Sequence, residues 1–428
     1  MHRPLARTGT FAALSVLSLS VVLSPWVAVA AYAVVALGAA TVTEGRLFEA
    51  LSTHVDVEDG RLRTLIAFSA TSGALAALLP AIDLPPEIYV ATMLAVGLGD
   101  LGKRSVEAVS PGSVPATAGF VFVGGAAAIL GQLFLAGSIA VTPLSVFVAG
   151  SAAFVGALLR SVLYARNDPL VLGFLVVLLW LLADLAVGTT WTAVGIGLGV
   201  SFLFGSLSIA LETASIPGML TGVFLSLVAV VLGGVGWFVL LIAFFGIGGL
   251  STKYRYDRKV RRGVAEENEG ARGTGNVLGN SLAALVALLL FAAHARLPVP
   301  GEVLVVAFAG SVATALADTL SSEIGGLYDR PRLLTTLEPV EPGTDGAVTW
   351  QGEVAGIAGA ALIAVLSVWF LPLPWPTVLV VIAAGLVGMT VDSAAGATIE
   401  GRYVGNQAVN FLATSAGGCA GAVLALVL

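Results

Sequence analysis

The stretch GEVLVVAFAGSVATALADTL, residues 301–320, decides the fold class of this chain. It contains no charged residue between Val303 and Ala317, and its first charge after that run is Asp318. A run of about 20 mainly apolar residues is long enough to cross the hydrocarbon core of a bilayer as one helix. The sequence therefore predicts a membrane-spanning helix with an ionisable group near one end.

Similar apolar runs recur along the whole chain. Of its 428 residues, 57% are hydrophobic and 11% are charged, whereas a soluble domain has about 25% charged residues. This composition excludes a soluble globular enzyme. We predict an all-α polytopic membrane protein with about fifteen transmembrane helices. The predicted segments are 9–24, 26–43, 64–82, 86–102, 115–137, 139–159, 169–186, 189–209, 214–232, 234–250, 276–295, 302–322, 353–371, 376–397 and 406–428.

The basic residues predict the topology of these segments. When the chain is threaded alternately from a cytoplasmic N-terminus, 19 of the 20 lysines and arginines fall on one side, and Arg296 is the exception. Lys and Arg are retained on the cytoplasmic side of membrane proteins. We therefore expect a multi-pass protein of the cell (plasma) membrane with an external C-terminus. Alternatively, segment 9–24 is a cleaved signal peptide, because Arg3 and Arg7 precede it.

The two halves of the chain resemble each other in the order of their landmarks. We predict two parallel tandem repeats, at residues 1–186 and 187–428. Arg160 stands where the second half has Asp392, and a guanidinium cannot hold a metal ion. We therefore expect a catalytic second half and a degenerate first half that is structural or binds lipid. The paired landmarks are Asp100 with Asp318, Val109–Ser113 with Val340–Thr344, Gly156–Ser161 with Gly388–Ser393, and Asn167 with Asn406.

Several kinds of site chemistry are excluded by residue counts. The single cysteine, Cys419, excludes a disulfide framework and a thiolate zinc site. The three histidines are far apart in the sequence, so no histidine metal site or Ser-His triad is indicated. The remaining candidates are carboxylates, amides and bases near predicted helix ends.

Three carboxylates lie at predicted cytoplasmic helix ends: Asp318, Glu323 and Asp392. Ionisable groups at membrane depth are costly and usually functional, although an interfacial helix cap is the alternative for residues 317–326. Carboxylate oxygens are hard ligands that suit Mg²⁺. We predict that these three side chains form a magnesium site.

The loop 252–280 carries seven bases between Lys253 and Arg272. One interpretation is a topology anchor that also touches acidic lipids. The glycines around Arg272 favour a second interpretation, because they let the backbone approach an anion closely. Lys253, Arg272 and Arg332 could neutralise phosphates. Arg332 lies in the loop 331–352, for which an ordinary solvated connection is the alternative interpretation. This inventory fits phosphoryl or nucleotidyl transfer.

Five ordered motifs of the second half carry a family resemblance: Lys253-Tyr with Gly263–Glu267 and Gly270–Gly273; Asn276–Leu278; Ala317–Gly325; Val340–Gly346; and Asp392–Thr398. They resemble the integral-membrane family that contains plant phytyl-phosphate kinase and transmembrane protein 19, with its domain of unknown function 92. The first half loosely resembles the dolichol and phytol kinase family. That likeness rests on Gly99-Asp100, Lys103–Ser105 and Asn167–Leu170.

The resemblance implies a kinase that transfers a phosphoryl group from CTP or ATP to a membrane-dissolved prenyl monophosphate, such as phytyl or geranylgeranyl phosphate. Mg²⁺ would be its cofactor, the bilayer would hold its acceptor, and no nucleic acid is implied. Alternatives are a polyprenol kinase, a lipid cytidylyltransferase and a membrane transporter. The resemblance implies metal binding by Asp318, Glu323 and Asp392, nucleotide binding by Lys253, Arg272, Arg332 and Asp345, and acceptor orientation by Asn276, Asn280 and Asn410.

Overall fold

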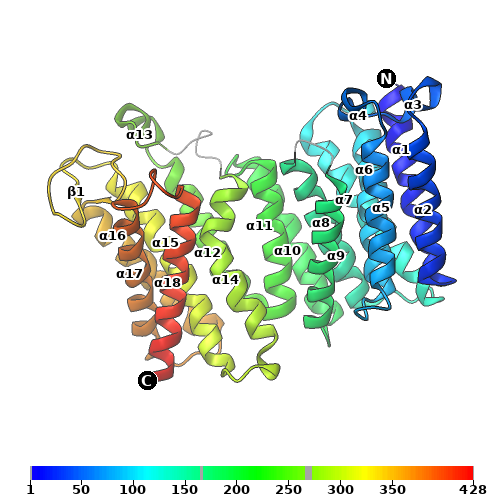
Figure 1. The fold of residues 1–428 in the computed structure, drawn as a ribbon. Helices are drawn as coiled ribbons and strands as arrows, with labels where there is room; N and C mark the ends of the chain where they lie inside the picture. Colours follow the sequence, from blue (N-terminus) through cyan, green and yellow to red (C-terminus); the bar gives the residue numbers. More distant parts are fainter. Residues whose placement is uncertain (1, 164–166, 266–271, 428) are drawn as a thin grey trace. The chain divides into compact units, whose positions relative to one another are not determined.

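The computed structural model describes residues 2–163, 167–265 and 272–427, and these are almost entirely helical (Figure 1). The chain divides into two compact units, Met1–Val194 (unit 1) and Gly195–Leu428 (unit 2). The predicted boundary between residues 186 and 187 lies close to this division. The roles assigned to the two halves stay predictions.

Unit 1 is drawn from blue to green in Figure 1. Its central helix is α6, which packs against α1, α7, α8 and α9, while α5 packs against α2 and α9. The helices are α1 (His2–Val16), η1 (Leu17–Val22), α2 (Pro25–Thr41), α3 (Gly45–Leu51), α4 (His54–Asp59), α5 (Arg63–Leu78), α6 (Pro86–Val109), α7 (Ser113–Ala136), α8 (Pro143–Val162) and α9 (Asp168–Leu185).

Unit 2 contains most of α10 and all later elements. Its central helix is α15, which packs against α12, α14, α16, α17 and α18. The elements are α10 (Trp191–Ala210), α11 (Ile216–Val228), η2 (Ala229–Gly233), α12 (Val235–Lys253), α13 (Tyr256–Arg262), α14 (Thr274–Ala292), η4 (His294–Arg296), α15 (Gly301–Gly325), β1 (Arg332–Leu333), β2 (Ala347–Val348), α16 (Trp350–Phe370), α17 (Thr377–Gly396) and α18 (Asn406–Val427).

Helix starts follow local sequence signals. Proline occupies the first turn of α2, α8 and α9, where its missing N–H costs nothing. The hydroxyl of Ser215 accepts a hydrogen bond from the N–H of Gly218, and that of Thr349 accepts one from Gly352. These caps satisfy backbone donors that would otherwise be left without a partner at the helix ends.

The number of spanning helices is smaller than expected. Within the described residues, 11 helices are long and apolar enough to cross a membrane, or 12 if Pro25–Thr41 and Gly45–Leu51, which meet at a 118° bend, form one span. Each predicted segment is helical. However, segments 9–24 and 64–82 are shorter apolar helices, and α6, which contains segment 86–102, carries charged residues near both of its ends.

In both units, the central helix contacts the helices that follow it in the same order along the chain. In unit 1, α6 contacts the three helices that follow it, and α5 contacts the last of these. In unit 2, α15 contacts the three helices that follow it, and α14 contacts the last of these. This likeness supports the predicted duplication, which stays a prediction, as does the orientation of the termini.

Three helices of unit 2 meet at Thr314 without space for further atoms. A Cβ atom on Gly388 of α17 would lie 2.2 Å from the hydroxyl of Thr314, and one on Gly417 of α18 would lie 1.9 Å from it. The Thr314 hydroxyl donates to the carbonyl of Gly310 at 2.9 Å, within α15. Membrane helices associate largely through such close packing of small residues. We call this contact the Thr314 junction.

We predict that Gly388→Ala destabilises the protein, because the added methyl group cannot fit beside Thr314 without moving α15 or α17. Overpacking of this kind costs about 1–3 kcal/mol. The thermal-unfolding midpoint of the purified protein in detergent measures the effect. Gly246→Ala is the matched control, since a Cβ there meets nothing within 4 Å. An equal midpoint for the two variants would show that the junction is not tightly packed.

Candidate functional site

A polar cavity of about 360 Å³ lies in unit 2 where α15 and α17 end. Its walls come from these helix ends, from the segment after α13 and from the loop that holds β1 and β2. It is lined by Gly263, Val264, Ala265, Asp318, Ser321, Ser322, Glu323, Gly325, Gly326, Tyr328, Pro331, Pro342, Gly343, Thr344, Asp345, Gly346, Ala347, Thr349, Asp392, Ser393, Glu400 and Asn406.

The Thr314 junction places two carboxyl groups opposite each other in this cavity. Asp318 lies four residues after Thr314 on α15, and Asp392 lies four residues after Gly388 on α17. Residues four apart share a helix face, so the contact one turn below brings Asp318 and Asp392 together. The two carboxyl groups interact directly, with Glu400 and Arg272 within electrostatic range of Asp318.

One oxygen of this pair lacks a hydrogen bond. The Oδ1 atom of Asp392 is buried, and no described residue donates to it. A buried acceptor without a donor is costly, and two adjacent carboxylates repel each other. A cation held by these two groups would lower both costs.

Glu400 extends the acidic character of the cavity. Burial raises the pKa of Glu400, the nearby negative charge of Asp345 raises it further, and a hydrogen bond with Asn406 lowers it. The Asp345 loop packs closely on α17, because a Cβ on Gly346 would lie 2.3 Å from the backbone nitrogen of Ala397. Gly346 also has a φ of +74°, which favours glycine.

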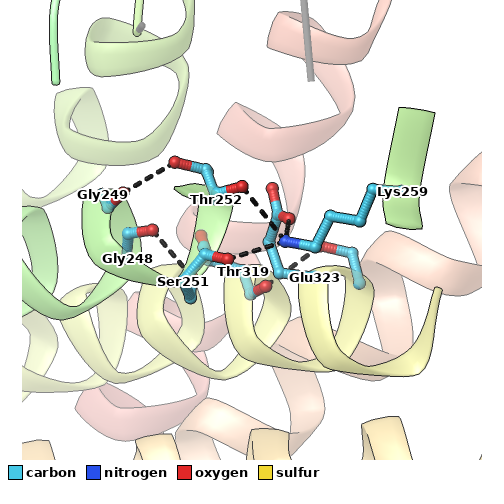
Figure 2. Close-up of polar contacts among 8 residues, drawn as sticks. Gly248, Gly249, Ser251, Thr252, Lys259, Thr319 and Glu323 are labelled. Carbon is cyan, nitrogen blue, oxygen red and sulfur yellow. Dashed lines mark hydrogen bonds and ion pairs between the residues drawn. The ribbon is translucent and has the colours of Figure 1, made fainter. Parts of the chain in front are cut away.

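A buried ion pair borders the cavity on the side of α12 and α13 (Figure 2). Lys259 of α13 is fully buried. Its ammonium donates to the carbonyls of Ser251 at 2.6 Å and Thr252 at 3.2 Å, and it forms an ion pair with Glu323 of α15. All three donors of the ammonium group are thereby used, as burial of a charged lysine requires.

Arg262 fastens α13 to the segment after α15. Its Nε donates to the carbonyl of Gly326 at 2.9 Å, and one terminal nitrogen donates to the carbonyl of Tyr328 at 2.7 Å. The other terminal nitrogen of Arg262 pairs with the Asp329 carboxylate at 2.7 Å, and this hydrogen bond lowers the pKa of Asp329. Lys259 and Arg262 therefore hold one wall of the cavity, whereas Arg255, Arg258 and Arg261 of the same loop are exposed.

Arg272 is buried beside the carboxylate pair. Its backbone N–H donates to the carbonyl of Thr213 at 3.0 Å, and its carbonyl accepts from the N–H of Ser215 at 3.0 Å. Its guanidinium lies over the ring of Phe244 at 5.1 Å. A Cβ on Gly248 would lie 2.8 Å from this guanidinium, so Gly248 leaves the space that the side chain occupies.

The predicted site residues separate into two groups. Asp318, Glu323, Asp345 and Asp392 line the cavity, and Arg272 lies within electrostatic range of Asp318. The remaining residues are absent from the described lining. Lys253 donates to the carbonyl of Leu211 at 2.6 Å, Arg332 donates to the carbonyl of Leu337 at 2.6 Å, Asn280 donates to the carbonyl of Asn276 at 3.0 Å, and Asn410 donates to the side chain of Asn406 at 3.2 Å.

The structure differs from the predicted three-carboxylate metal cluster. Among the described residues, no group of three or more His, Cys, Asp or Glu side chains could hold a metal ion. The physical reason is that Glu323 forms an ion pair with Lys259, whereas Asp318 and Asp392 interact with each other. The pair Asp318 and Asp392 remains. A magnesium ion commonly binds one or two protein carboxylates and completes its shell with water and substrate phosphates.

Three cavity residues, Ser393, Glu400 and Asn406, are not among the predicted site residues, and neither is Lys259, which borders the cavity. Lys259 lay among seven bases, and only its burial distinguishes it from its exposed neighbours. Glu400 and Asn406 follow Asp392 in a polar segment at a predicted helix end, and this position is the sequence feature that points to them. Residues 266–271 of the same loop lie outside the described residues.

Comparisons with known proteins place the chain in a family. Residues 199–418 match the family described as integral membrane protein DUF92. Because this match covers half of the chain, the protein belongs to that family of integral membrane proteins. It is a multi-pass membrane protein whose matched region lies within unit 2 and contains the cavity.

Relatives that are similar to part of the chain include the following three proteins. An uncharacterized membrane protein of Synechocystis sp. is 31% identical over 194 residues, 44% of this chain and 74% of that protein. An uncharacterized membrane protein of Methanocaldococcus jannaschii is 35% identical over 195 residues, 45% of this chain and 77% of that protein. The chloroplastic protein VTE6 of Arabidopsis thaliana is 30% identical over 215 residues, 47% of this chain and 65% of VTE6. No solved structure matches the chain.

We predict that Lys259→Met destabilises the protein by about 3 kcal/mol, because it leaves the Glu323 carboxylate buried without its counter-charge. The double variant Lys259→Met/Glu323→Gln should recover part of this loss, since it removes both charges. Unfolding midpoints in detergent measure both effects. Arg258→Met, an exposed change in the same helix, is the control. Additive losses in the double variant would contradict a coupled pair.

Proposed function

We propose that the protein is a Mg²⁺-dependent kinase that transfers a phosphoryl group from a nucleoside triphosphate, CTP or ATP, to a prenyl monophosphate dissolved in the membrane. The observation that carries this proposal is the charge of the cavity. Its described lining contains five carboxylates, Asp318, Glu323, Asp345, Asp392 and Glu400, and no lysine or arginine. Phosphates enter such a cavity only together with cations.

The pair Asp318 and Asp392 would hold the magnesium ion. The fit rests on the orphaned buried oxygen of Asp392 and on the direct contact of the two carboxyl groups. When bound, Mg²⁺ would neutralise phosphate oxygens during transfer, which is the main requirement of phosphoryl-transfer catalysis.

The protein's own groups would position the substrates. Arg272 is buried, and its positive charge lies within electrostatic range of Asp318. Gly343 and Gly346 have positive φ values and let the backbone of their loop approach a phosphate. Lys259 holds Glu323 and the wall of the cavity, so it acts by positioning and does not contact substrate.

The position of the cavity supports this class of acceptor. It opens at the ends of helices whose outer faces expose large apolar side chains, among them Val354, Ile357 and Leu379. A prenyl tail would stay among such side chains in the bilayer while its phosphate reaches the acidic cavity. The motifs that resemble the phytyl-phosphate kinase family support this acceptor. We further propose the plasma membrane as the location and the cytoplasm as the side that the cavity faces.

Asp318→Asn and Asp392→Asn should each lower the Mg²⁺-dependent kcat at least about a hundredfold, because each removes one charge of the carboxylate pair. The assay uses the purified protein with geranylgeranyl or phytyl monophosphate and γ-labelled CTP or ATP, and label is followed into the prenyl diphosphate. Glu338→Gln, in an exposed loop position, is the control. Full activity in both aspartate variants would overturn the proposed site.

The same assay separates the alternative activities. A polyprenol kinase would label the free alcohol, and a cytidylyltransferase would release pyrophosphate without labelling the acceptor from the γ-position. A transporter would move substrate into proteoliposomes without nucleotide.

Removal of divalent cations should weaken nucleotide binding. With EDTA, the dissociation constant for the nucleotide should rise by at least about tenfold, because the carboxylates then repel the triphosphate. Added Mg²⁺ should restore binding, and isothermal titration calorimetry measures both states. Equal nucleotide affinity with and without Mg²⁺ is the contrary result.

A further inference from the structure

Unit 1 contains a second polar cavity, of about 300 Å³, near the start of α1 and the ends of α6 and α8. Its charge is opposite to that of the cavity in unit 2. Its lining contains one acid, Asp100, and His54, together with four lysine or arginine residues, namely Arg7, Lys103, Arg104 and Arg160. We call it the basic cavity.

Arg160 is the buried base of this cavity. Its side chain is 9% exposed, lies 3.1 Å from the carboxylate of Asp100, and also pairs with Asp168. Its Nε atom is buried and has no hydrogen-bond partner among the described residues. A guanidinium carries five N–H donors, so Arg160 keeps donor capacity after its two ion pairs. An acceptor in the basic cavity would satisfy it.

Lys103 adds a charge that forms no ion pair with any described residue. Arg104 pairs with Glu107 at 2.7 Å along the surface of α6. Lys103 is half-buried, and no ion pair joins it to any part of the chain that the structure describes. Asp168, Glu107 and the buried Asp56 lie behind or beside the lining and offset part of this charge, but within the lining itself four bases stand against one acid. The basic cavity is therefore suited to an anion.

The wall opposite α6 is held in place before any ligand binds. Asp56 of α4 is fully buried and accepts hydrogen bonds from the backbone N–H groups of Thr53 at 2.8 Å and Thr64 at 2.9 Å. It also accepts from their hydroxyl groups at 2.9 and 2.6 Å. Both threonines line the basic cavity. A preorganised wall lowers the cost of ordering that binding must overcome.

We propose that the basic cavity binds a phosphate monoester group without a metal ion. A guanidinium and an ammonium group around one anion match the three oxygens and double charge of such a group. In the aligned halves, Arg160 stands where unit 2 has Asp392, so a fixed positive charge replaces the carboxylate that would require a cation. The phosphate would come from a lipid headgroup or from free inorganic phosphate.

The test uses the purified full-length protein with EDTA, so that binding in the acidic cavity of unit 2 is suppressed. Isothermal titration calorimetry is run with inorganic phosphate, with dihexanoyl phosphatidic acid, and with dihexanoyl phosphatidylcholine. We expect binding of phosphatidic acid and not of phosphatidylcholine. Lys103→Ala should weaken it about tenfold, the effect of losing one hydrogen bond to a charged group. Lys103→Arg should retain it.

Arg46→Ala is the matched control, an exposed base of unit 1 outside the basic cavity. Arg160→Lys is a second variant, which keeps a charge for Asp100 and should still weaken binding. Binding of inorganic phosphate as well identifies the phosphate group itself as the ligand, and binding of phosphatidic acid alone identifies the lipid headgroup. No binding of either probe, or binding that Lys103→Ala leaves unchanged, overturns the proposal.

Discussion

The Thr314 junction is the contact on which the candidate site of unit 2 depends. A spanning helix satisfies its own backbone hydrogen bonds, so helices in a bilayer associate mainly through the fit of their side chains. Glycine at positions 388 and 417 lets α17 and α18 approach the hydroxyl of Thr314. One turn further along, the same approach brings Asp318 and Asp392 together. The same helix contact therefore packs the core of unit 2 and sets the positions of the two carboxyl groups.

The charges near this site fall into two kinds with different tasks. Lys259 and Glu323 neutralise each other and use the remaining ammonium donors on backbone carbonyls. Such a pair holds elements together, since burying either charge alone is costly. Asp318, Asp392 and Glu400 have no such counter-charge within the described cavity lining. Their mutual repulsion makes the cavity a place for cations and for anions that arrive with cations.

The two units arrange helices in a similar order around cavities of opposite charge. In unit 2 the lining is acidic, and in unit 1 it is basic. Under the predicted duplication, Arg160 of unit 1 stands at the position of Asp392 in unit 2. One substitution of a carboxylate by a guanidinium changes which ions a buried site can accept, because each charge there must be balanced locally.

The sequence by itself determined the membrane-spanning helical fold, the position of most helices, the family resemblance and the candidates Asp318, Asp392 and Asp345. These follow from local properties, such as apolar runs, helix caps and spacing along one helix. Only the tertiary structure decided that Glu323 pairs with Lys259, that Lys253 and Arg332 lie away from the described cavity lining, and that Glu400 and Asn406 belong to it. The reason is that a buried charge pairs with a group on another helix, and the sequence does not show which group that is.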